Sequence, residues 1–278
     1  MRSARRGDDV APVRAFGLAL LIVIVALGAG LRLHGLGEVD FRGDEVTYYL
    51  DLRDGARPLP WLAGHLVTFG HDRQMPLPRV LGAFVVNTLG LPADASTVRL
   101  PFALAGAATP LAFWWLAMQL ARLGGEGRTR ALRLAALAAL FVAVNPYHLY
   151  WSRTAHIYVY PMLFLGLAGG GAVAWLRSLR RGRDREPRGR AWLAVTAAGL
   201  TLAGYAHMST WIAGGLVWAG LAVAWVRARR PDLLRRAGGE RPAPAPRPGP
   251  WPRALAAGVL AWGVLLAPWA WQFLTALL

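Results

Sequence analysis

The sequence contains no cysteine and no lysine, and only 15 of its 278 residues are acidic. Without cysteine the chain has no disulfide and no thiol nucleophile, and its redox compartment is left open. Charged residues make up 17% of the chain against 55% apolar residues, and the mean hydropathy is +0.36. A soluble domain of this length carries far more charge, so these scarcities indicate an integral membrane protein.

Long apolar runs predict an all-α integral membrane fold with about seven transmembrane helices. The candidate spans are residues 15–33, 100–120, 131–150, 157–176, 191–207, 210–226 and 254–276. A further run, residues 77–91, is short and contains Pro78 and Arg79, so we expect it to lie in the interface or to dip partway into the membrane. The predicted divisions are an N-terminal tail (1–14), a main transmembrane module (15–226) with an outer loop (34–99), a basic Pro-rich linker (227–253) and a last spanning helix (254–278).

Arginine supplies every basic side chain, and the formal net charge is +16. If residues 77–91 do not cross, 23 of the 31 arginines fall on one side of the membrane, which the positive-inside rule assigns to the cytoplasm. This pattern explains the charge without a nucleic-acid partner. We therefore expect a multi-pass protein of the cell (plasma) membrane with a cytoplasmic N-terminus and its histidines at the outer face.

Residues 41–49, FRGDEVTYY, hold two adjacent carboxylates, Asp44 and Glu45, after a glycine and before paired tyrosines. Acidic residues gather in the loop around this motif. The loop either uses its carboxylates for chemistry or ion binding, or is merely kept solvated by them; for the adjacent pair we favour a function. Short interfacial helices are expected at residues 45–53 and 61–70.

A second polar stretch, residues 145–160, has the sequence NPYHLYWSRTAHIYVY. An arginine at the membrane face among hydroxyls and imidazoles, as Arg153 is here, suits an anionic group such as a phosphate. The alternative interpretation is an aromatic belt at the interface with a snorkelling arginine.

Together these stretches resemble the GT-C type of membrane glycosyltransferase, in particular its protein O-mannosyltransferase and aminoarabinose-transferase branch. The resemblance runs in order through about residue 226, and it is carried by Gly43-Asp44-Glu45 with Tyr48-Tyr49, Pro76-Leu77, Val98-Arg99-Leu100-Pro101, and Pro146 followed by Ser152-Arg153 and Tyr158. Members of the family usually continue with more spans and an outer domain, so the chain looks like an N-terminal module.

The resemblance implies an inverting glycosyltransferase that moves a monosaccharide from a polyprenyl-phosphate donor to an acceptor hydroxyl on a protein, lipid or polysaccharide. It implies that Asp44 is the general base, that Glu45 contacts the acceptor or a metal, and that Arg153 contacts the donor phosphate. The other candidate substrate-binding residues are Tyr48, Arg99, His156 and Tyr158. No cofactor is required by this chemistry; for a divalent metal, the candidate ligands are His71 and Asp72.

Two other functions stay open. A non-catalytic or truncated relative would bind polyprenyl-linked sugar or scaffold glycan assembly in the membrane. A transporter or channel would call for acidic residues buried mid-membrane, and none of the predicted spans contains one.

Overall fold

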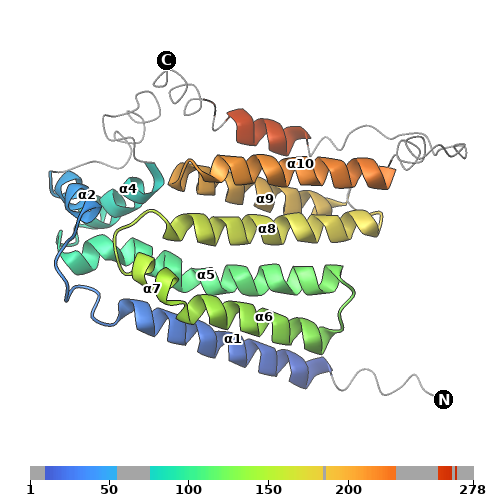
Figure 1. Ribbon diagram of the computed structural model, residues 1–278, viewed down its shortest axis with the longest axis horizontal. Helices are drawn as coiled ribbons and strands as arrows, with labels where there is room; N and C mark the ends of the chain where they lie inside the picture. Colours follow the sequence, from blue (N-terminus) through green and yellow to red (C-terminus); the bar gives the residue numbers. More distant parts are fainter. Residues whose placement is uncertain (1–9, 55–75, 184–185, 230–255, 265–266, 268–278) are drawn as a thin grey trace, which may run out of the picture.

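The computed structural model describes residues 10–54, 76–183, 186–229, 256–264 and 267, and all regular structure within those ranges is helical. Six long helices lie side by side (Figure 1), which confirms the predicted all-α class. They are α1 (Val10–Leu33), α5 (Ala95–Leu123), α6 (Arg128–Val144), α8 (Val159–Arg180), α9 (Pro187–Ala206) and α10 (Thr210–Arg229). A further helical segment, residues 256–264, lies against α10, where Trp262 contacts Gly214.

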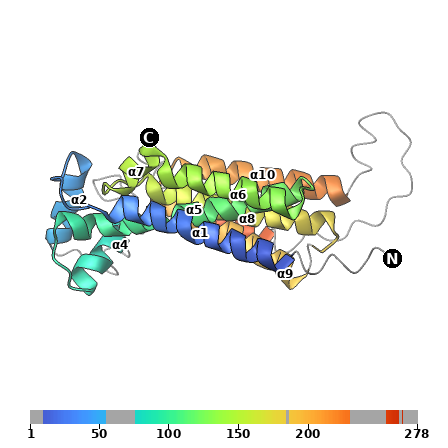
Figure 2. The same cartoon turned by 90° about the horizontal axis from the view of Figure 1, so that it is seen from below.

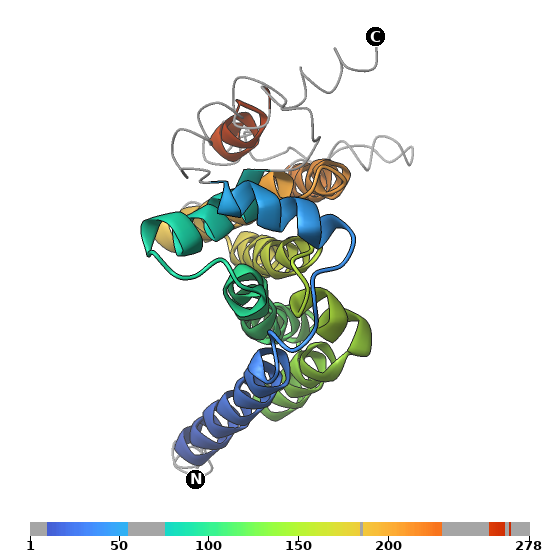
Figure 3. The ribbon, with the colours of Figure 1, turned by 90° about the vertical axis from the view of Figure 1, so that its left-hand side faces the viewer.

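Three short helices gather at one end of the bundle, which we call the Asp44 end. They are α2 (Asp44–Arg53), α4 (Pro76–Ala83), which continues into the π-helical turn η2 (Phe84–Thr88), and α7 (Pro146–Ser152). Figure 2 shows this end beyond the long helices, and Figure 3 looks onto it, with α2 and α4 across the helix ends.

The opposite end, which we call the arginine-rich end, holds the α5–α6 turn, the α8–α9 turn and the last turn of α10. Its described arginines are Arg122, Arg128, Arg130, Arg133, Arg177, Arg180, Arg181, Arg183, Arg188, Arg190, Arg227 and Arg229. All four described histidines, His34, His148, His156 and His207, lie instead at the Asp44 end. The two ends of the bundle therefore differ sharply in charge.

Four described helices are long and apolar enough to cross a membrane: α1 over Ala15–Leu33, α5, α8, and α10 over Thr210–Ala228. The predicted count of seven is not confirmed. The glycines, threonines and two arginines of α9 lower its hydropathy, so α9 is not among these four. The predicted helix 254–278 lies largely outside the described residues.

The predicted span 131–150 is broken in the structure, and α6 and α7 meet at 57°. Helix α6 ends at Val144, and Asn145 begins α7 by accepting a hydrogen bond from the main-chain nitrogen of His148 (2.9 Å). Pro146 follows at the first helical position, where its missing N–H costs nothing. Counted as one span, the bent pair would be a fifth crossing.

The run predicted to dip into the membrane forms α4 and η2 and then turns at Gly90, which has φ of 70°. Its 13 helical residues span about 20 Å at 1.5 Å per residue, which is short of a hydrocarbon core of about 30 Å. That this run does not cross the membrane stays a prediction.

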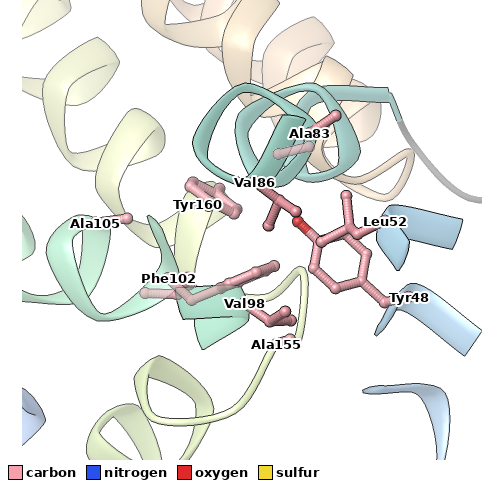
Figure 4. Close-up of a cluster of buried hydrophobic side chains, with 11 residues drawn as sticks. Tyr48, Leu52, Ala83, Val86, Val98, Phe102, Ala105, Ala155 and Tyr160 are labelled. Carbon is pink, nitrogen blue, oxygen red and sulfur yellow. The ribbon is translucent and has the colours of Figure 1, made fainter. Parts of the chain in front are cut away.

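A buried aromatic cluster fixes α2 and α4 to the bundle (Figure 4). The ring of Phe102 on α5 lies 5.5 Å from that of Tyr48 on α2 and 5.1 Å from that of Tyr160 on α8. The Tyr48 hydroxyl donates to the carbonyl of Pro78 on α4 (2.7 Å), and Gly82 leaves the room that this hydroxyl needs. The helix predicted at 45–53 is thus present as α2, whereas 61–70 lies outside the described residues.

Candidate active site at the Asp44 end

The two adjacent carboxylates have opposite environments. Helix α2 begins at Asp44, and successive helical residues point about 100° apart, so Asp44 faces out while Glu45 faces the bundle. Glu45 is 1% exposed and is paired with Arg99 of α5, which is 2% exposed. The pair is bidentate, with Nε to Oε1 at 2.8 Å and Nη2 to Oε2 at 2.9 Å.

Arg99 is fully occupied by this arrangement. Its remaining N–H groups donate to main-chain carbonyls of the loop before α2, those of Leu36 (3.1 Å), Val39 (2.7 Å) and Asp40 (3.2 Å). All five guanidinium N–H groups therefore have partners. Phe41 lies over the guanidinium at 5.3 Å from ring centre to Cζ. Arg99 thus acts as a clamp on the loop.

Arg99 joins α5 to α2 and to the loop before α2, and Glu45 adds a fourth segment, the one that contains Ala155. Its Oε1 also accepts from the main-chain nitrogen of Ala155 (2.7 Å), and its Oε2 accepts from that of Arg42 (3.3 Å). Burial raises the pKa of Glu45, but the hydrogen bonds and positive charge of Arg99 and the two main-chain donors outweigh burial and hold the pKa below its ordinary value. Glu45 is an ionised structural anchor.

These contacts bear on two of the predicted site residues. Glu45 was predicted to contact the acceptor or a metal, and Arg99 to bind substrate, and both roles stay predictions. Both side chains border a cavity, where they form an ion pair and make further hydrogen bonds within the protein. In the structure they hold together the segments around them.

Asp44 is exposed, and its carboxylate makes no hydrogen bond or ion pair with any described residue. It lines a cavity of about 100 Å³ together with Tyr48, Arg79, His156 and Tyr158. The N-terminal position on α2 favours its negative charge through the helix dipole. An exposed carboxylate on a cavity wall, with no partner among the described residues, is suited to accept a proton.

Two neighbours of Asp44 are held in place. Arg79 is paired with Asp51 of α2 at 2.7 Å. Burial raises the pKa of Tyr48, whose hydroxyl stays protonated and donates to Pro78. The predicted substrate-binding residue Tyr48 therefore shapes the cavity with its ring, while its hydroxyl is already engaged.

A second cavity, of about 280 Å³, carries positive charge. Arg42, Arg153 and His156 line it, as do Asp40 and the already paired Arg99. Arg153 makes only two long bonds, to the carbonyls of Leu31 and Gly35, both at 3.3 Å. The exposed Arg42 guanidinium bonds no described residue. Arg42 and Arg153 are thus the cations that an anion entering this cavity would meet.

A third cavity, of about 320 Å³, is lined by Tyr147, His148, Trp151, Tyr158, Val159 and Met162. Trp151 forms the wall between the cavities, with its ring centre 4.7 Å from that of His156 and 4.9 Å from that of Tyr158. We call the first the Asp44 cavity, the second, lined by Arg42 and Arg153, the cationic cavity, and the third the aromatic cavity. The cationic and Asp44 cavities share His156 as a lining residue, and the Asp44 and aromatic cavities share Tyr158. The cationic and aromatic cavities have no lining residue in common. The Asp44 cavity therefore borders both of the others.

The structure places Asp44, His156 and Tyr158 around one cavity, and Arg153 with His156 around the neighbouring one. His71 and Asp72, the candidate metal ligands, lie outside the described residues. Within the described part of the chain, no group of three or more histidine and acidic side chains has the arrangement of a metal site.

Several site residues were missed in the sequence. Arg42 directly precedes the Gly-Asp-Glu motif, and that adjacency was an available signal. Trp151 was visible only as part of an aromatic run. Arg32 and His148 form a buried pair, with Nη2 and Nδ1 2.8 Å apart, although they are 116 positions apart in the sequence. The only sequence feature that pointed to this pair was an arginine inside an apolar run.

Comparisons with known proteins found no matching family model, no matching curated protein and no matching solved structure.

Proposed function

We propose that the chain is a membrane glycosyltransferase that transfers a monosaccharide, with inversion, from a polyprenyl-phosphate donor to an acceptor hydroxyl. One observation carries the proposal. The unpartnered carboxylate of Asp44 lines a cavity that shares His156 with the cavity holding Arg42 and Arg153. A base and an anion-binding site on neighbouring walls are the two elements that this reaction needs.

The phosphodiester of the donor occupies the cationic cavity, where Arg153 and Arg42 bind its oxygens. The fork of donors on a guanidinium matches a phosphate better than the point charge of an ammonium does. As the bond between the anomeric carbon and the phosphate oxygen breaks, the phosphate gains a second negative charge. Two arginines then bind the leaving group more tightly than the donor, and this difference lowers the barrier.

Asp44 acts on the other face of the sugar. It accepts the proton of the acceptor hydroxyl as the oxygen attacks the anomeric carbon, and the polyprenyl phosphate departs with the electron pair of the broken bond. The proton ends on Asp44, the sugar on the acceptor, and the configuration is inverted. A polyprenyl phosphate leaves as a stable anion, so one carboxylate with nearby cations is a sufficient catalytic set.

The charge distribution supports an outward-facing site. The arginine-rich end suits the cytoplasmic side under the positive-inside rule, so the Asp44 end faces the outer side, where a lipid-linked sugar is presented. Residues 34–54 and 146–158 then lie at the outer membrane surface, at the level of a lipid phosphate.

The test is the substitution Asp44→Asn, which keeps the size of the side chain and removes its basicity. We expect transfer from a polyprenyl-phosphate hexose to fall by about 100-fold or more, the usual scale for loss of a general base, with protein yield and donor binding unchanged. Asp54→Asn is the matched control, because Asp54 is an exposed acid at the other end of the same helix, 3.2 Å from Arg53. Full transfer by the Asp44 variant would refute the assignment. A wild-type chain that binds the donor but transfers nothing would instead be a non-catalytic lipid-binding relative.

A further inference from the structure

The aromatic cavity contains a histidine whose protonation is dictated by a buried arginine. Arg32 is fully buried in α1, and its Nη2 lies 2.8 Å from Nδ1 of His148. Arginine nitrogens only donate hydrogen bonds, so Nδ1 of His148 accepts, and the neutral ring carries its proton on Nε2. Arg32 is held by further bonds to the carbonyls of Gly28 (2.8 Å), Ala143 (2.9 Å) and Val142 (3.1 Å).

The Nε2–H group of His148 has no hydrogen-bond partner among the described residues, although the residue is only 3% exposed. A buried N–H without an acceptor costs about 1–3 kcal/mol, so such a group in a cavity wall calls for a ligand atom. Since Nδ1 is turned toward Arg32, the opposite edge of the ring is what remains to face the cavity that His148 lines. The indole N–H of Trp151 is also buried and unpaired in the same wall.

The other walls are aromatic and uncharged. Tyr147 and Tyr158 stand at the surface, 70% and 46% exposed, and Val159 and Met162 complete the lining. Aromatic faces beside a few fixed hydrogen-bond donors are typical of small-molecule sites, and the volume is within their usual range of about 300–1,000 Å³. No charged side chain lines the cavity, which favours a neutral ligand with acceptor oxygens.

We propose that this aromatic cavity is the acceptor subsite and that the acceptor is a carbohydrate ring. This inference rests on the proposed glycosyltransferase function. The apolar C–H face of a pyranose packs on the rings of Trp151 and Tyr158, while its hydroxyl oxygens accept from His148 Nε2 and Trp151 Nε1. A polyprenyl or acyl chain would leave both N–H groups unpaired.

Shared lining residues connect the three cavities. In the proposed complex the donor phosphate lies in the cationic cavity, the anomeric carbon lies beside Asp44, and the acceptor ring lies in the aromatic cavity. A hydroxyl of the bound ring that reaches past Tyr158 then meets Asp44, which accepts its proton as the oxygen attacks the anomeric carbon.

Saturation-transfer NMR on the full chain in detergent tests this without relying on transfer. The probes are methyl pyranosides of glucose, galactose, mannose and N-acetylglucosamine. We expect at least one to receive saturation at its ring hydrogens, and Trp151→Phe and Tyr158→Leu each to reduce the signal at least threefold. Trp218→Phe is the matched control, because Trp218 on α10 is another buried indole whose N–H has no partner among the described residues, and it does not line the cavity. The control should bind the sugars as the wild type does.

Three outcomes would overturn the inference. One is the absence of saturation for every sugar. Another is an equal signal in the Trp151, Tyr158 and Trp218 variants. The third is a loss of undecaprenyl phosphate binding in the Trp151 and Tyr158 variants without a loss of sugar binding, which would assign the cavity to the prenyl chain. Transfer assays separate this inference from the proposed function. Transfer to a Ser/Thr peptide but to no sugar would refute the acceptor subsite and leave the glycosyltransferase intact, whereas sugar binding without any transfer would count against the enzyme.

Discussion

Replacing Glu45 by glutamine should destabilise the protein severely, although the change removes one charge and no volume. The variant leaves the guanidinium of Arg99 buried at 2% exposure without its counter-charge. Removing one partner of a buried ion pair costs about 3–5 kcal/mol, because the other charge stays desolvated and uncompensated. At about 2–4 °C per kcal/mol for a chain of this size, the midpoint of thermal unfolding should fall by roughly 6–20 °C.

The contacts of Arg99 extend this prediction. Arg99→Met should cost more than Glu45→Gln, because it also leaves the carbonyls of Leu36, Val39 and Asp40 without a donor. The double variant should lose less unfolding free energy than the two single variants lose in sum. The second substitution then removes a charged group that the first has already left without its partner. The measurement is thermal unfolding of purified protein in detergent, followed by tryptophan fluorescence.

Asp44→Asn is the matched control for this series, because it makes the same chemical change one residue away on an exposed, unpaired side chain. We expect its free energy of unfolding to stay within about 0.5 kcal/mol of wild type.

The stabilisation by Glu45 also depends on pH. Its folded-state pKa is lowered, so the stabilisation is present above the unfolded pKa and is lost as the pH falls through the folded one. The gap between wild type and Glu45→Gln should therefore close in acid. A Glu45→Gln variant as stable as Asp44→Asn would refute the structural role.

Three further predictions concern binding, packing and orientation. Arg153→Ala should strongly weaken the affinity for polyprenyl-phosphate sugar, as measured by titration, and Arg153→Lys should recover only part of that affinity. Unchanged affinity in the alanine variant would favour the alternative interpretation, a snorkelling arginine in an aromatic belt. Gly82→Ala should cost about 1–3 kcal/mol in thermal unfolding, because its Cβ would meet the Tyr48 hydroxyl, whereas Gly215→Ala, with open space around it, should be neutral or slightly stabilising. A single cysteine at Asp44 should react with an impermeant maleimide in whole cells and one at Glu126 should not; the reverse pattern would invert the proposed topology.

The sequence indicated which stretches carry the candidate site, but not which of its two adjacent carboxylates is buried. Asp44 and Glu45 are adjacent acidic residues with the same chemistry in the sequence. The helical rotation between them places Asp44 at the surface and Glu45 against Arg99, 54 residues away. An ion pair between distant residues leaves no local pattern, so Glu45 was read as a reactive group. Exposure and periodicity could not have distinguished the two, because α2 is too short and too polar to show an apolar face.

Helix breaks were also hard to read. Asn145-Pro146 is a recognisable helix start, yet the apolar run on both sides of it led to a single predicted span at 131–150. Hydropathy averages over such a break, while the cap acts through one side-chain oxygen and the main-chain nitrogen of His148. The same averaging favoured α9 as a span, since its two arginines lie outside the predicted core at 191–207.

The clamp around Arg99 imposes an order on biogenesis. Synthesis is vectorial, and Glu45 leaves the ribosome before Arg99 and long before Ala155, whose main-chain nitrogen lies 110 residues further along. Until α5 and the segment after α7 have been inserted, the loop carrying Asp44 has no anchor, and its carboxylates remain hydrated. The Asp44 end therefore matures only after residue 155 has been made, although α2 is among the first helices synthesised, and a nascent chain stopped before residue 155 would lack the complete clamp.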